Sequence, residues 1–162
     1  HFDHEASRFA LTIRTPDTAI VAELPSWEAT VLFNREALSQ STTDIHFDMT
    51  ALSTGDPDWD RTLTGPDWFD VANHPTARAG ASWFERIGPM QFATFGTVTL
   101  RGVTRPSENR FTVLADEDGR LRVVGTMRFD RTEFGLGPGL WQLFQPFDRW
   151  IELEFELVPA GR

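Results

Sequence analysis

Hydrophobic and polar residues alternate with a period of two along much of the chain. The clearest run is the last, where Ile151, Leu153, Phe155 and Leu157 alternate with three glutamates. Strict alternation is typical of strands that bury one face and expose the other, as antiparallel strands do. The other alternating runs lie within residues 8–14, 27–33, 44–50, 111–115 and 121–130.

Turn signals separate these runs. Thr15-Pro16-Asp17 follows the first run, and residues 116–119 end in an Asp-Gly pair, which tolerates the positive φ of a tight hairpin. Many short strands with turns between them predict a β-sandwich or an up-and-down barrel. The 162 residues contain no stretch that resembles a linker, so we predict one domain spanning residues 1–162.

Two segments break the alternation. Residues 56–73 contain Pro57, Gly65 and Pro66, and we predict a crossover there with one or two helical turns, in which Pro66 takes the first helical position. Residues 133–147 contain several glycines and prolines and yet are strongly apolar. A loop of this kind is expected to fold back on the core or to cover an apolar opening.

Composition narrows the class of partner. The chain has 14 Phe, 6 Trp, no Cys and a net charge of −9. An acidic surface repels nucleic acid and anionic lipid head groups, so we expect no nucleic-acid partner. The absence of Cys excludes disulfides and thiolate metal sites. No apolar run approaches the roughly 20 residues that a membrane-spanning helix needs.

Motifs for catalysis or metal binding are weak. Asp56, Asp58 and Asp60 resemble the start of a calcium loop, but Arg61 stands where the loop needs glycine for its sharp turn. The four histidines show no metal-ligand spacing, and there is no nucleophile elbow. We therefore expect a protein that is not an enzyme and has no cofactor; the alternative is a hydrolase or redox enzyme with an unrecognised site.

Arg131 is unusual because it stands at an odd-numbered position, like the apolar Met127 and Phe129, and so is expected on the same inward face. A buried arginine must be paired or hydrogen-bonded. One interpretation is a salt bridge with Glu133 that closes the end of a barrel. The other is a hydrogen-bond donor for the polar head of a ligand.

Several blocks in fixed order resemble the YceI-like family over nearly the whole chain. The most specific is the run GTVTLRGVTRP at residues 96–106. The other blocks are residues 51–56, Leu63 with residues 67–70, His74-Pro75 and residues 129–137. The resemblance implies an all-β fold: an eight-stranded antiparallel extended β-barrel, lipocalin-like, with a short helical crossover around residues 57–70.

The family resemblance also implies a function. Members look like carriers of polyisoprenoids or isoprenoid quinones, are typically periplasmic or secreted, and in some cases are attached to a b-type cytochrome membrane domain. The stretches at residues 67–69 and 137–141 look similar to that attached subgroup. We therefore expect a polyprenol or isoprenoid quinone as ligand, with a homodimer and a membrane cytochrome as further partners. Ala79–Ser82 departs from the family pattern, and its small residues are expected either to widen the lumen or to weaken that wall.

An eight-stranded barrel encloses just enough space for side chains or for one slim ligand. We expect these residues along the lumen: Phe9, Phe33, Phe47, Phe92, Val98, Phe111, Met127 and Phe129. We expect these at its mouth or in a lid: Trp68, Phe69, Phe134, Trp141 and Phe144. Two alternatives remain: the barrel is a solid aromatic core, or the domain docks on a membrane or partner through the hydrophobic 134–147 loop.

Overall fold

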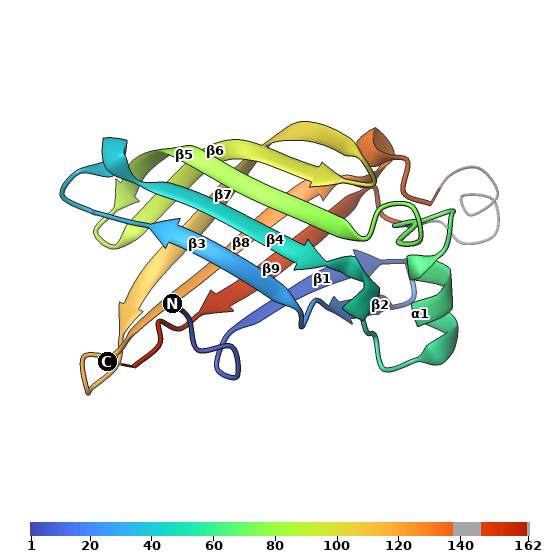
Figure 1. The fold of residues 1–162 in the computed structure, drawn as a ribbon, viewed down its shortest axis with the longest axis horizontal. Coiled ribbons are helices and arrows are strands. Elements are labelled where there is room, and N and C mark those ends of the chain that lie inside the picture. The colour runs from blue at the N-terminus through green and yellow to red at the C-terminus, as the bar shows by residue number, and fades with distance from the viewer. Residues whose placement is uncertain (138–146, 162) are drawn as a thin grey trace.

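The computed structural model describes residues 1–137 and 147–161 and consists mainly of one antiparallel sheet (Figure 1). Its strands are β1 (Arg8–Arg14), β2 (Ala19–Glu23), β3 (Trp27–Leu32), β4 (Thr42–Asp48), β5 (Thr76–Gly88), β6 (Gln91–Leu100), β7 (Val103–Ala115), β8 (Leu121–Asp130) and β9 (Trp150–Leu157). Three 3₁₀ turns cover Leu38–Gln40, Met49–Ala51 and Arg131–Phe134. The α-helix of the described chain is α1 (Pro57–Thr64).

The strand order is β2-β1-β9-β8-β7-β6-β5-β4-β3, and the sheet curls into a half-barrel around the core (Figure 1). The predicted all-β antiparallel fold with one short helix is confirmed. The sheet has nine strands rather than eight because residues 19–23 fold back on β1 as a separate strand after the turn at Thr15–Thr18. Side chains bridge the two edges: the Phe9 ring lies 5.0 Å from Trp27 and 4.9 Å from Phe47.

The period-two pattern sets which side chains face the interior. In β9, Ile151, Leu153 and Leu157 are buried, whereas the glutamates between them are more exposed. The pattern changes register in β5, where a bulge between Ala81 and Trp83 lets Phe84 point inward and leaves Trp83 62% exposed. Alternation therefore identifies the inner face correctly within each part of β5, but it does not carry across the bulge.

The helix lies within the predicted 57–70 crossover and begins at its first residue. Pro57, not Pro66, takes the first helical position, and the Asp56 side chain caps the helix by accepting a hydrogen bond from the Asp58 amide at 2.9 Å. Asp60 accepts from the Thr54 amide and hydroxyl, both at 2.7 Å. Asp56 thus caps the helix and Asp60 holds the crossover, whereas the Asp58 carboxylate pairs with Arg61 on the helix surface. Within residues 1–137 and 147–161, no cluster of His, Cys, Asp or Glu is arranged to hold a metal ion.

The two ends of the half-barrel differ. At one end lie α1 and the crossover from β4 to β5; at the other lie both chain termini (Figure 1). Leu63, Trp68 and Phe69 are almost completely buried and fill the first end. Among the helices of the described chain, none has the length and apolar character required to cross a bilayer.

Candidate functional site

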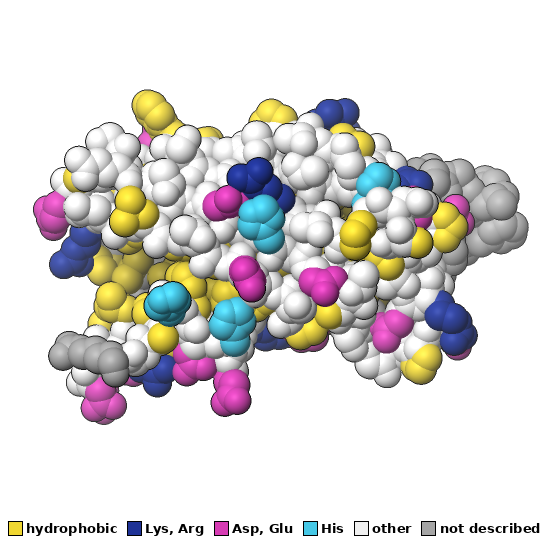
Figure 2. Space-filling model, viewed as in Figure 1, with side chains coloured by type: hydrophobic (Ala, Val, Ile, Leu, Met, Phe, Trp, Pro, Cys, Tyr) yellow, Lys and Arg dark blue, Asp and Glu magenta, His cyan; other side chains and the backbone are white. Residues whose placement is uncertain are grey.

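A large cavity opens at the end of the half-barrel that carries the termini. Its volume is about 860 Å³, within the usual range of small-molecule sites. Figure 2 shows hydrophobic side chains inside the hollow at this end. The cavity is lined by inward-facing residues of β1 and β3–β9 together with the N-terminal residues and the loop after β3.

Strand register arranges one wall of the cavity in rows. The middle row crosses five adjacent strands, β6, β7, β8, β9 and β1, and consists of Phe92, Phe111, Gly125, Phe155 and Phe9. The rings of Phe92 and Phe111 stack 5.4 Å apart. Gly125 makes room for Phe155, because a Cβ at this position would lie only 2.5 Å from the tip of that ring. The middle row is therefore an aromatic wall, interrupted at Gly125, where the ring of Phe155 lies over the glycine.

The opposite wall is built from aliphatic residues, among them two alanines. Ala29, Ile45 and Ala79 are neighbours on β3, β4 and β5, and all three line the cavity. The short side chains of Ala29 and Ala79 leave open the space between this wall and the aromatic wall. Of the small residues at 79–82, Ala79 lines the cavity, and the expected widening of the lumen stays a prediction.

The floor of the cavity is the next row toward the closed end. It consists of Phe84, Thr94, Asn109, Met127, Leu153 and Leu11 on six consecutive strands. Met127 and Leu153 line both the large cavity and a separate void of only about 20 Å³. Beyond the floor the interior is packed, so a ligand has one open end through which to enter.

Polar and charged groups are distributed unevenly. Thr94 and Asn109 introduce polar atoms into the floor row, which contains no ionisable side chain. His1, Arg35 and Glu36 line the cavity near its mouth. The deep part of the cavity is therefore apolar with one polar position, and the ionisable side chains lie at the entrance.

The predicted lumen residues fall into two groups. Phe9, Phe33, Phe47, Phe111 and Met127 line the large cavity. The other three lie elsewhere: Phe92 is fully buried between the rings of Phe33 and Phe111, whereas Val98 and Phe129 border the small void. Contact of any of these residues with a ligand stays a prediction.

Three of the five residues predicted at a mouth or lid lie away from the mouth of the large cavity. Trp68, Phe69 and Phe134 are buried at the closed end and form a plug, with Phe134 packed 5.5 Å from the ring of Phe129. Gly137, at φ 71°, packs so closely on the Trp68 indole that a Cβ would lie 2.8 Å from the ring. Trp141 and Phe144 lie outside the described residues.

Arg131 organises this plug. Its guanidinium is 3% exposed and donates to the carbonyl oxygens of Asp148 and Leu136, both at 2.9 Å, and of Gly137 and Phe147, both at 3.3 Å. Burial lowers the pKa of Arg131 from its ordinary value. Neither sequence-based interpretation describes this arrangement, because Glu133 is exposed and Arg131 is not among the residues that line the cavity.

Asp130 and Arg101 complete the closed end. Burial acts to raise the pKa of Asp130, but hydrogen bonds from Thr132 and Arg149 outweigh it, so the pKa lies below its ordinary value. Arg101 adopts a left-handed backbone, φ 51°, and donates to the carbonyl oxygens of Gly135 at 2.6 Å and Pro66 at 2.7 Å. The 131–137 segment is thus tied to the crossover.

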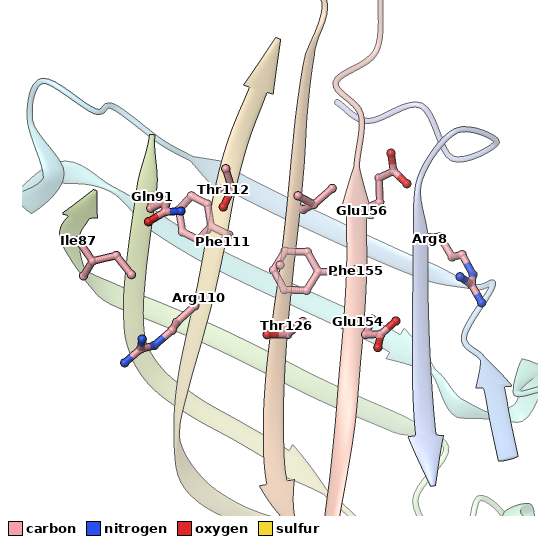
Figure 3. Close-up of a pocket in the computed structure, with 12 residues that line it drawn as sticks. Arg8, Ile87, Gln91, Arg110, Phe111, Thr112, Thr126, Glu154, Phe155 and Glu156 are labelled. Atoms are coloured by element: carbon pink, nitrogen blue, oxygen red, sulfur yellow. The ribbon is translucent and has the colours of Figure 1, made fainter. Parts of the chain in front are cut away.

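A second hollow of about 600 Å³ lies on the outer face of the sheet (Figure 3). Arg110 and Glu154 lie on either side of Phe155 in this view. Three of its four charged residues form surface ion pairs: Arg8 with Glu23, Arg110 with Glu108 and Glu156 with Arg122. These features are typical of the solvated outer face of a sheet.

Sequence reasoning missed several cavity residues. Phe155, Val123 and Leu153 carried a signal, because they share the apolar parity of their strands. Asn109 carried a signal too, because it is a polar residue at an inward-facing position of the strand that holds Phe111 and Val113. Ala29 and Ile45 carried the same signal within the alternating runs at residues 27–33 and 44–50, and register places them opposite the aromatic wall.

Comparison with known proteins agrees with this architecture. The model of the YceI-like domain matches residues 1–158. The chain belongs to the YceI-like family. A UPF0312 protein of Pseudomonas syringae pv. tomato is 25% identical over 119 residues, which are 70% of this chain and 62% of that protein. The chain thus matches less than two thirds of the length of this curated relative.

Solved structures share the fold at low sequence identity. Burkholderia cenocepacia BcnA superposes with a TM-score of 0.91 at 20% identity, covering 99% of this chain and 100% of that one. A polyisoprenoid binding domain from Saccharophagus degradans gives 0.73 at 14% identity, covering 99% and 97%. The Campylobacter jejuni YceI protein gives 0.69 at 17% identity, covering 90% and 86%.

Proposed function

We propose that the cavity binds the apolar chain of an isoprenoid lipid, a polyprenol or an isoprenoid quinone, and that the domain stores or carries this lipid. The observation that carries the proposal is the open cavity of about 860 Å³ between an aromatic wall and an aliphatic wall. A solid core would need no such space. The shared fold with a polyisoprenoid binding domain supports the same ligand class.

The energetics suit a hydrocarbon. Each 100 Å² of ligand hydrocarbon removed from water contributes about 2.5 kcal/mol, and the cost of association offsets part of that gain. The middle row offers only aromatic rings and Gly125. Burial without directed hydrogen bonds favours affinity over chemical specificity, as a carrier of long chains requires.

Binding rather than catalysis fits the residues of the site. General acid–base chemistry needs a titratable side chain close to the reacting group. The floor and middle rows carry no such side chain, and those that line the cavity near its mouth are more accessible to water. A periplasmic or secreted location, a homodimer and a membrane cytochrome partner stay predictions from the family resemblance.

A pair of tryptophan variants tests the proposal. Ala29→Trp places an indole inside the cavity, whereas Leu32→Trp places one on the outer face of the same strand, where Leu32 is 61% exposed. We expect one solanesol or ubiquinone per wild-type chain in native mass spectrometry. Affinity should fall about tenfold or more in Ala29→Trp and remain unchanged in Leu32→Trp. Absence of uptake by the folded wild-type protein, or equal uptake by both variants, contradicts the proposal.

A further inference from the structure

The floor of the cavity contains a pair of polar side chains, and the described residues leave one of them without a partner for its buried oxygen. Thr94 and Asn109 lie directly opposite each other on β6 and β7, and both line the cavity. Thr94 is 4% exposed. The side-chain oxygen Oδ1 of Asn109 is buried and has no hydrogen-bond partner among the described residues.

An unpaired buried amide is costly to stability, so its presence calls for an explanation. The row neighbours Phe84, Met127 and Leu153 offer no conventional donor or acceptor from their side chains. A leucine at position 109 would fit the apolar parity of its strand without leaving any polar atom unpaired. The amide is therefore better explained by a partner that enters the cavity.

The chemistry of that partner follows from the amide and its surroundings. The Asn109 amide presents an N–H donor on one side and an oxygen acceptor on the other. Rotating the amide by half a turn exchanges these two positions, but the group still needs one partner for the donor and one for the acceptor. A hydroxyl group supplies a donor and an acceptor together, whereas a ketone or an ether supplies an acceptor alone. The pair therefore favours a hydroxyl over the carbonyl of an oxidised quinone.

Charge decides between a neutral and an anionic group. The floor row contains no cationic side chain, whereas Arg35 lines the cavity near its mouth. Moving a phosphate to the floor would strip it of water without a compensating charge. An anionic head is therefore disfavoured at this depth.

We infer that the ligand enters polar end first and that Asn109 and Thr94 hydrogen-bond a neutral hydroxyl at the floor, as in a polyprenol or a quinol. This inference rests on the proposed lipid-binding function. The hydrocarbon chain then runs outward past Phe111 and Phe155 toward the mouth. The polar pair selects among isoprenoids that the apolar walls accept equally.

The test compares three ligands that differ at one end: geranylgeraniol, its methyl ether and geranylgeranyl phosphate. For the wild-type protein we expect the alcohol to bind about tenfold more tightly than the ether, and the phosphate to bind more weakly than the alcohol. Asn109→Leu should bring alcohol and ether to equal affinity, and Thr94→Val should reduce the preference. Thr97→Val, which removes an exposed hydroxyl from the outer face of β6, should leave the preference unchanged.

The possible outcomes separate this inference from the proposed function. If no ligand binds to the folded wild-type protein, lipid binding itself fails. If alcohol and ether bind the wild type equally well, lipid binding stands and the inference is overturned. A preference that persists in Asn109→Leu also overturns it. The wild-type ligand series decides the matter even if a floor variant does not fold.

Discussion

Replacement of Arg131 by methionine tests whether this residue stabilises the closed end. Methionine retains much of the apolar length of arginine but removes donors to four backbone carbonyls. Hydrogen bonds to charged groups contribute about 1.5–3 kcal/mol each, so the two bonds of 2.9 Å alone represent a loss of about 3–6 kcal/mol. The substitution also removes the cost of burying the guanidinium, and we expect a net loss of about 2–4 kcal/mol.

Thermal and urea unfolding measure this loss. A domain of this size shifts its midpoint by about 2–4 °C per kcal/mol, which predicts a decrease of about 5–15 °C for Arg131→Met. Arg105→Met is the matched control, because Arg105 is exposed and its side chain donates only to the neighbouring Thr104 carbonyl. The control should change the free energy of unfolding by less than about 0.5 kcal/mol.

Ligand binding separates a structural Arg131 from one that contacts the lipid. Arg131 is absent from the cavity lining, so Arg131→Met should keep wild-type lipid affinity well below its own midpoint temperature. Unchanged stability together with lost binding would refute the reasoning. Equal destabilisation by Arg131→Met and Arg105→Met would refute it as well.

Two further substitutions test the closed end and the aromatic wall. Asp130 has a depressed pKa, so its stabilising contribution is present above about pH 4 and is lost as pH falls through the folded-state value. Asp130→Asn should therefore lower the free energy of unfolding by about 1–2 kcal/mol at neutral pH, and the gap to wild type should shrink as pH falls below about 4, as measured by urea unfolding; a gap independent of pH contradicts this. Gly125→Ala brings a Cβ within 2.5 Å of the Arg110 carbonyl oxygen, whereas Gly80→Ala meets nothing closer than 3.4 Å. Only Gly125→Ala should therefore cost about 1–3 kcal/mol in thermal unfolding, and equal melting temperatures for the two variants would contradict this.

Much of the fold is encoded in local patterns. Period-two alternation identified strands and their inner faces, because most inward residues are apolar and form the core. Phe9, Phe47, Phe111 and Met127 were placed in the lumen on this basis, and the structure puts all four there. Parity also distinguished Arg131 as inward-facing before its partners were known.

Depth within the barrel could not be predicted in the same way. Phe111 and Phe129 share the inward parity of their strands, but one lines the open cavity and the other borders the packed end. Register between strands sets that difference, and a single strand does not reveal its register. Trp68 and Phe134 were assigned to the mouth because apolar loops often cover openings, but backbone carbonyls held by Arg131 and Arg101 fix their segment at the opposite end.

The most direct test of the central claim is native mass spectrometry of the protein isolated from bacterial cells, followed by solvent extraction and identification of any bound lipid. The account predicts a stoichiometric adduct whose mass corresponds to an isoprenoid and which carries a neutral hydroxyl group. A folded protein that shows only its own mass, and takes up neither added polyprenol nor added quinol, would contradict it.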